Sequence, residues 1–227
     1  MDEIKHFKQN LRAIEEIKYL EGAPLIYRTN CSVGMVMDHK NKAMGDTFLM
    51  TPIAWRVFSD DLYQKGHRKW IEFFFINEKG NLTNIAIHGI SAEEFLKETL
   101  SEIYYEGKQM SELVFQLYFE KKKGTDGDQE WSYFICRFSI VDELDEETIN
   151  HIADLTKDFK LYRSDSITQE ATEHQADNYH FLSSETAIPQ AASSDVIAKT
   201  DSSEPKPKRE EKPKAAKPKK KRAAKKN

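Results

Sequence analysis

The sequence has few cysteines and no long apolar run. Only Cys31 and Cys136 are present among its 227 residues, and neither has a second cysteine or a histidine at metal-ligand spacing. We therefore expect two free thiols in a reducing compartment and no metal centre. No stretch reaches the roughly 18 apolar residues of a membrane-spanning helix, and the amino terminus lacks the features of a signal peptide. These absences predict an intracellular protein, cytoplasmic or nucleoid-associated.

The common sequence motifs of enzymes are also missing. There is no Gly-rich phosphate loop, no His-Glu-x-x-His and no Gly-x-Ser-x-Gly. Glu120, Lys121 and Lys122 do resemble part of a metal-dependent nuclease motif of the restriction type, but its upstream aspartate is missing and Glu112 is the only nearby acid. We therefore expect a protein that is not an enzyme and uses no cofactor, with a metal-dependent nuclease as a lesser alternative.

The net charge of −4 combines two regions of opposite sign. Residues 205–227 contain 12 Lys/Arg and 2 Asp/Glu, a net of +10, which leaves −14 for residues 1–204. Lysines in an extended Lys/Ala/Pro segment bind phosphates by releasing counterions, without sequence preference. The tail therefore predicts a nucleic-acid contact, and the alternative is a solubilising or localisation segment. Its densest cations, taken as predicted ligands, are Lys219, Lys220, Lys221 and Arg222.

Composition divides the chain into three parts. Residues 1–160 have the mixture of apolar and charged residues of one globular domain. Residues 161–204 are poor in large apolar side chains and rich in Ser, Thr, Ala and acids, which predicts a disordered acidic linker. Residues 205–227 form the disordered basic tail.

Two hairpins and a helix are predicted in the centre of the domain. Residues 69–76 are aromatic and β-branched, residues 77–81 read as a turn, and residues 82–88 as the partner strand. Residues 112–121 and 131–141 predict a second hairpin. Between them, Ser91 and Glu94 read as a capping box at the start of a helix that Gly107 ends.

Further elements flank this centre. Apolar residues every three or four positions predict a helix over residues 1–21, and acids at 145–147 precede a final amphipathic helix. Strands are expected over 23–37 and 46–50, and Thr51 with Pro52 predicts a helical turn towards residue 62. The fold class is therefore mainly β with flanking helices (α+β).

Aromatic residues beside cations on a sheet surface suit single-stranded nucleic acid, because unpaired bases stack on rings while cations follow the phosphates. In the first hairpin, alternation places Trp70, Glu72 and Phe74 on one face, and Glu72 indicates that this face is solvated. The alternative is that these rings pack beneath a terminal helix as core. The predicted binding residues of the domain are Trp70, Phe74, Tyr118, Tyr133 and Arg137, with Lys65, Arg68 and Lys69 at the strand entry.

The order of strand, hairpin, helix and hairpin over residues 23–142 resembles the OB-fold single-stranded DNA-binding proteins of phages and mobile elements. The resemblance implies a five-stranded barrel with a helix between the third and fourth strands. The chain departs from that family in its charge. Residues 1–160 hold 20 Lys/Arg against 28 Asp/Glu, and the tail is basic where many single-strand binders end in acids.

The sequence therefore predicts a nucleic-acid-binding protein that favours single-stranded DNA, with RNA possible as a ligand. Rings on the sheet would stack on bases, and the tail would add electrostatic affinity. The alternative is an interaction or scaffold module whose acidic body binds another protein while the tail anchors it to nucleic acid. No membrane partner is expected.

Overall fold

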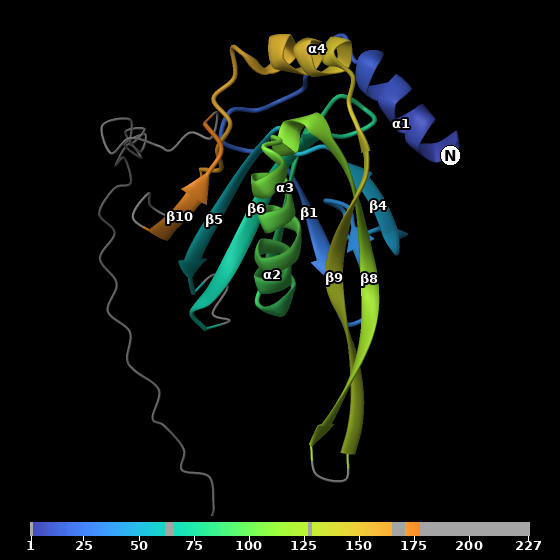
Figure 1. Cartoon of the computed structure of the whole chain (residues 1–227), viewed down its shortest axis with the longest axis vertical. Helices are drawn as coiled ribbons and strands as arrows, with labels where there is room; N and C mark the ends of the chain where they lie inside the picture. Colours follow the sequence, from blue (N-terminus) through green and yellow to red (C-terminus); the bar gives the residue numbers. More distant parts are fainter. Residues whose placement is uncertain (1, 62–65, 127–128, 165–170, 178–227) are drawn as a thin grey trace, which may run out of the picture. The chain divides into compact units, whose positions relative to one another are not determined.

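The computed structural model describes residues 2–61, 66–126, 129–164 and 171–177, and only the backbone of residues 125, 126, 129 and 130. This part of the chain is mainly β with a few helices, as predicted (Figure 1). Its strands form two sheets. The larger has the order β10 (Thr172–Gln175), β5 (Ala54–Asp60), β6 (Arg68–Ile76), β7 (Leu82–His88), β1 (Leu25–Asn30), β2 (Met35–Met37), β3 (Ala43–Gly45). The smaller has the order β4 (Thr47–Met50), β8 (Leu113–Asp126), β9 (Gln129–Glu143).

The five-stranded OB-like barrel is not confirmed. The described strands form open sheets of seven and three strands, and β1 pairs with β7 in parallel. The predicted helix lies between β7 and β8 in the chain, so it does not follow the third strand. The sequence pattern correctly placed a helix between two hairpins, but the additional strands of the larger sheet were not expected.

Both predicted hairpins are present. In the first, β6 pairs antiparallel with β7, and the Asn77 side chain closes the turn by accepting hydrogen bonds from the backbone N–H groups of Lys79 and Asn81, both at 3.0 Å. In the second, β8 and β9 pair from Leu113↔Glu143 to Asp126↔Gln129, which is longer than predicted. Figure 1 shows this second hairpin as a long twisted ribbon.

The central helix is present and ends as predicted at Gly107, which has a φ of 66°. Its three parts are α2 (Ile90–Glu94), the π-helical η2 (Phe95–Leu100) and α3 (Ser101–Glu106). The predicted capping box is wrong, because Gly89 is the N-cap and Ser91 lies inside the helix. The Ser91 hydroxyl instead accepts a hydrogen bond from the Cys136 backbone at 2.9 Å, which ties the helix to β9. No helix in the described ranges is long and apolar enough to cross a membrane.

Two flanking helices differ from prediction. Residues 51–62 were expected to start a helix, but Ala54–Asp60 is strand β5, and its alternation puts Trp55 and Val57 opposite Arg56 and Phe58. The first helix, α1 (Asp2–Arg12), ends well before residue 21. The chain after it still buries Ile14 and Ile17, so their apolar spacing reflected burial and did not require a longer helix.

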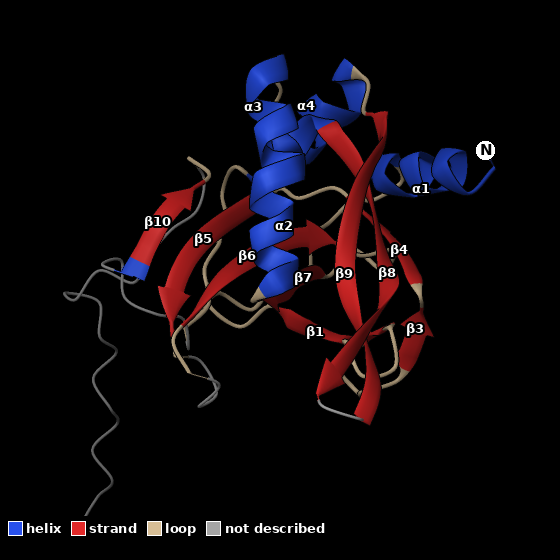
Figure 2. Ribbon diagram, turned by 60° about the horizontal axis from the view of Figure 1, so that its bottom comes forward, coloured by secondary structure: helices blue, strands red, loops and turns tan. Residues whose placement is uncertain are grey.

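The core has two parts. Phe73 on the larger sheet, Phe95 on the helix and Phe138 on β9 meet in the first, with ring centroids 5.0 to 5.5 Å apart. The second lies where Phe74 and Ile76 of β6 meet α1 and α4 (Glu146–Thr156). Figure 2 shows α2 and α3 lying across the strands of the larger sheet.

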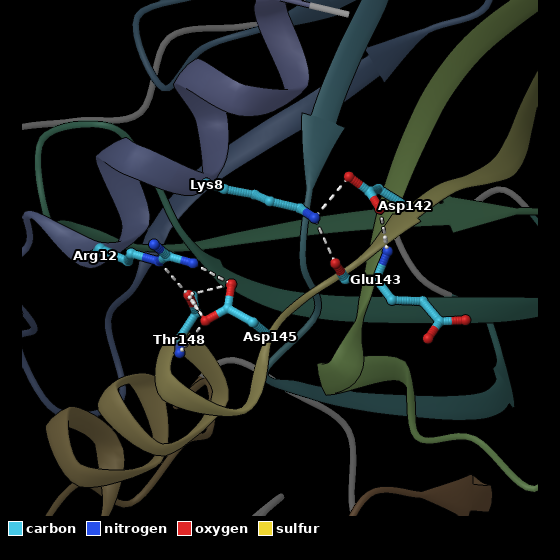
Figure 3. A network of polar contacts seen from close by, with 6 residues as sticks. All are labelled: Lys8, Arg12, Asp142, Glu143, Asp145 and Thr148. Carbon is cyan, nitrogen blue, oxygen red and sulfur yellow. Dashed lines mark hydrogen bonds and ion pairs between the residues drawn. The ribbon is translucent and has the colours of Figure 1, made fainter.

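Polar contacts join α1 to the end of β9 and the start of α4 (Figure 3). The Lys8 amine donates to the Glu143 carbonyl and pairs with Asp142 at 2.6 Å. Arg12 pairs with Asp145 and donates from Nε to the Thr148 hydroxyl at 2.7 Å. These contacts link residues more than 130 positions apart, so the two ends of the domain close on each other.

The fold extends past the predicted boundary at residue 160. Leu161 and Arg163 are 1% and 7% exposed, and β10 pairs antiparallel with β5. This part of the predicted acidic linker therefore belongs to the fold. The rest of the linker and the tail lie outside the described residues.

Candidate nucleic-acid interface

The predicted solvent face of the first hairpin is buried, so that prediction is wrong. Trp70, Glu72 and Phe74 are 3%, 1% and 0% exposed. The Trp70 ring contacts the His88 ring at 4.5 Å between centroids, and its indole N–H donates to the Asp60 carbonyl at 3.1 Å. Phe74 belongs to the core beneath α1 and α4. In this structure neither ring can stack on a base.

Glu72 can be buried because two arginines neutralise it. Arg56 and Arg163 each donate to one of its carboxylate oxygens at 3.1 Å, and Arg163 also donates to Asn84 at 3.2 Å. A buried carboxylate needs such partners, since its desolvation costs several kcal/mol. Alternation within β6 could not reveal this, because Arg163 is 91 residues further along the chain.

The second hairpin carries the predicted rings that are not buried, Tyr118 and Tyr133. Its register pairs Tyr118 with Arg137, Lys122 with Tyr133, and Gly124 with Trp131, and cross-strand partners share a face. We call the set Tyr118, Glu120, Lys122, Gly124, Trp131, Tyr133, Ile135 and Arg137 the outer hairpin face. Ile135, the partner of Glu120, is buried. The opposite face carries core residues such as Leu117 and Cys136. The structure thus brings together three predicted binding residues, Tyr118, Tyr133 and Arg137.

Trp131 was absent from the predicted set, although it is the most exposed ring of the outer hairpin face. It is 51% exposed, against 37% for Tyr118. Its ring stacks with that of Tyr133 at 5.0 Å between centroids and 29° between planes. The spacing Trp-x-Tyr in a strand places both rings on one face, and this signal could have identified the pair from the sequence.

Arg137 is surrounded by carboxylates. Its guanidinium pairs with Glu94 at 2.6 Å and with Glu98 and Glu120 at 2.9 Å. Hydrogen bonds from Lys122 and then from Arg137 hold the pKa of Glu120 below its ordinary value. Three carboxylates around one guanidinium make this end of the outer hairpin face net negative, so Arg137 is a poor ligand for phosphate.

The other predicted cations are dispersed. Arg68 is exposed at the start of β6, and Lys69 beside it pairs with Glu173 at 2.8 Å. On the hairpin, Lys121 and Lys123 are exposed and were not in the predicted set. Lys65 and the tail residues Lys219, Lys220, Lys221 and Arg222 lie outside the described residues.

Glu120, the acid named in the nuclease alternative, is paired with two cations. Both of its carboxylate oxygens are engaged by cations, one by Lys122 and the other by Arg137. In the described part of the chain, no group of three or more His, Cys, Asp or Glu is placed to hold a metal ion. Glu120 therefore acts as a counterion in this structure.

A separate groove lies between the helix η2–α3, α4 and the strands β5 and β10. Its volume is about 920 Å³, and much of its lining is apolar, including Trp55, Leu100 and Phe159. Tyr104 and Tyr105 also line it and are 78% and 85% exposed. None of the predicted binding residues that the structure describes lines the groove, so it is distinct from the outer hairpin face.

Comparisons with models of protein families, with curated proteins and with solved structures found no match to this chain.

Proposed function

We propose that this chain is a nucleic-acid-binding protein that prefers single strands and binds them on the outer hairpin face, with its basic tail adding electrostatic affinity. The observation that carries the proposal is the stacked pair of Trp131 and Tyr133, of which Trp131 is half-exposed. A large ring exposed to water on a sheet is a surface on which an unpaired base can stack. Trp70 and Phe74 have no part in it, because both are buried.

The charges of the described residues favour a single strand over a duplex. The carboxylates around Arg137 repel the phosphate backbone that a duplex presents on its outside. A single strand can turn its bases towards Trp131 and its phosphates away from these carboxylates, towards solvent. The resemblance to OB-fold binders is an analogy for this mode of stacking on a sheet.

The test is binding of the full chain and of residues 1–204 to labelled single-stranded and duplex DNA, followed by fluorescence anisotropy at about 50 and 200 mM salt. Residues 1–204 retain every described residue. We expect the truncated chain to bind more weakly and to keep its preference for the single strand. Loss of all binding on truncation would contradict a binding site in the body.

That negative result would favour the second candidate function, an interaction module that the tail anchors to nucleic acid. The specific observation in its favour is the exposure of Tyr104 and Tyr105 at the apolar groove. Large rings exposed beside a hollow are typical of protein interfaces. Replacing either tyrosine would then leave DNA binding unchanged.

A further inference from the structure

Gly124 lies inside strand β8, where glycine is an unfavourable residue. Glycine weakens a strand because its backbone loses more freedom on folding and it offers no side chain to pack. The backbone does not require it, since Gly124 is not among the described glycines with positive φ. The reason for glycine at this position must therefore lie in the space around it.

That space is filled by Trp131. A Cβ atom on Gly124 would lie 2.5 Å from Cζ2 and 2.6 Å from Cε2 of the indole, which is too close for two carbon atoms that are not bonded. The two residues are cross-strand partners, so the indole reaches over β8 at the position where the strand has no side chain. Any larger residue at position 124 would force the ring to move.

We infer that Gly124 is a positioning residue for nucleic-acid binding: it lets Trp131 lie across β8, stacked with Tyr133, as a preformed platform for one unpaired base. This inference rests on the proposed function and adds the residue that positions the stacking ring for an unpaired nucleobase. A ring already held in place loses little freedom on binding, which favours affinity.

The opposite side of the hairpin is held as well. Phe134 lies next to Tyr133 in sequence and points to the other face, where its ring packs over Gly34 in the β1–β2 turn. Its backbone N–H donates to the Cys31 carbonyl at 2.9 Å. The strand that carries Trp131 and Tyr133 is therefore anchored to the larger sheet, and the platform is supported from behind.

The charges near the platform favour binding of the base of a nucleotide over binding of its phosphate. Lys122 is the cross-strand partner of Tyr133 and shares its face, while Lys121 and Lys123 pair with Phe134 and Ser132 and face the other way. Lys122 is itself paired with Glu120, and this carboxylate weakens the attraction of the platform for phosphate. Stacking on the two rings then supplies the affinity.

The experiment uses the full chain with Gly124→Ala, Trp131→Ala, the double variant, and Ser132→Ala as a control that faces away from the platform. Affinity for a single-stranded oligothymidylate is measured at about 200 mM salt, where the tail contributes least. Quenching of tryptophan fluorescence by the oligonucleotide is followed in parallel. Trp70 is buried and Trp55 partly so, which makes Trp131 the tryptophan most accessible to a base.

We expect Gly124→Ala to weaken binding about tenfold, as Trp131→Ala does, in line with the loss of one stacked base. The double variant should bind no more weakly than Trp131→Ala alone and should melt at a higher temperature than Gly124→Ala, because the steric conflict is removed. Quenching should be lost in both single variants and kept in Ser132→Ala.

Two results would overturn the inference in different ways. If Trp131→Ala weakens binding and Gly124→Ala does not, Gly124 does not position the ring, and the proposed function stands. If neither variant alters affinity or quenching, the outer hairpin face is not the binding site, and both the inference and the proposed function of that face fail.

Discussion

Glu72 shows how one charged residue can be part of a core. Its carboxylate is 1% exposed and lies between the guanidinium groups of Arg56 and Arg163. In a medium of low dielectric constant these charges depend on one another, because removing one takes away an ion-pair partner of the others. The Arg163 contact also fixes the segment after residue 160 on the larger sheet.

Glu72→Ala should therefore lower the free energy of unfolding by about 3 to 5 kcal/mol, since it leaves two buried cations facing each other. Urea denaturation of wild type and variant measures the difference. Asp154→Ala is the matched control, because its ion pair with Lys157 is exposed and an exposed pair is worth less than about 1 kcal/mol. A similar small effect of both variants would show that Glu72 is not the centre of a buried network.

Asp145 is the N-cap of α4 and connects that helix to α1. The Thr148 backbone N–H donates to its carboxylate at 3.0 Å, and Arg12 pairs with it. The backbone hydrogen bond and then the arginine hold the pKa of Asp145 well below its ordinary value. A lowered pKa means that the carboxylate stabilises the fold above its unfolded pKa and that this stabilisation is lost as the pH falls through the folded pKa.

The melting temperature of Asp145→Ala should accordingly lie below that of wild type by a constant amount from pH 7 to about pH 5, above the ordinary pKa of aspartate. The difference should shrink below about pH 4, as the unfolded and then the folded wild-type carboxylate becomes protonated. Thermal melts followed by circular dichroism across this range check it. A difference in melting temperature that grows towards acid pH would contradict a lowered pKa of Asp145.

At the scale of elements, the β8–β9 hairpin carries stacking rings at one end and a cluster of carboxylates at the other. Glu120 lies between them and neutralises Lys122 and Arg137 on the same face. Lys122 would become available to phosphate if this carboxylate lost its charge, whereas Arg137 would still be paired with Glu94 and Glu98. We therefore expect the hairpin to attract bases at the end with the rings and to repel phosphates at the end with the carboxylates.

Glu120→Gln should strengthen binding of a single-stranded oligonucleotide, by about two- to tenfold at low salt. The slope of log affinity against log salt should steepen by about 0.7 if Lys122 then neutralises one additional phosphate. Anisotropy titrations at several salt concentrations measure both. Unchanged affinity would place the nucleic acid away from Glu120, and Mg²⁺-dependent cleavage lost in this variant would instead support the nuclease alternative.

The sequence predicted correctly those elements that are formed by contacts between residues close together in the chain. The β6–β7 hairpin has two runs of β-forming residues and a turn that Asn77 closes by itself. The strand β5 was mistaken for a helix because Thr51 and Pro52 resemble a helix start, whereas its pairing with β6 decided the outcome. Pairing with β6 therefore determined the structure of these residues, and the local helix-start residues did not.

The part of the candidate site that could be predicted from the sequence is the part that the pairing of two adjacent strands determines. Tyr118, Tyr133 and Arg137 share a face as the alternation of two paired strands requires. The exposure of Trp70 and Phe74 was not predictable, because distant parts of the domain cover the face that they share. Sequence alternation shows which residues share a face, but distant segments decide which face is exposed.

At the scale of the whole molecule, charge is divided between a body of net −14 and a tail of net +10. An acidic body repels nucleic acid at long range, and this repulsion is screened by salt. The tail supplies attraction of the opposite sign. Affinity of the full chain should therefore depend on salt more steeply than that of residues 1–204.

Removing residues 205–227 should reduce the salt slope on single-stranded DNA by about 0.7 for each tail cation that binds a phosphate. The tail offers 12 Lys/Arg, so a change of several units is expected if most of them take part. Titrations of both chains over a range of salt give the two slopes directly. Equal slopes would mean that the tail serves another purpose, such as solubility or localisation.

The most direct test of the central claim is the affinity of residues 1–204 for a single-stranded oligonucleotide when Trp131 or Tyr105 is replaced by alanine. Both rings are exposed, but only Trp131 lies on the outer hairpin face. We predict that Trp131→Ala weakens binding about tenfold and that Tyr105→Ala leaves it unchanged. Equal binding by Trp131→Ala and the unmodified chain, or a loss confined to Tyr105→Ala, would contradict the claim.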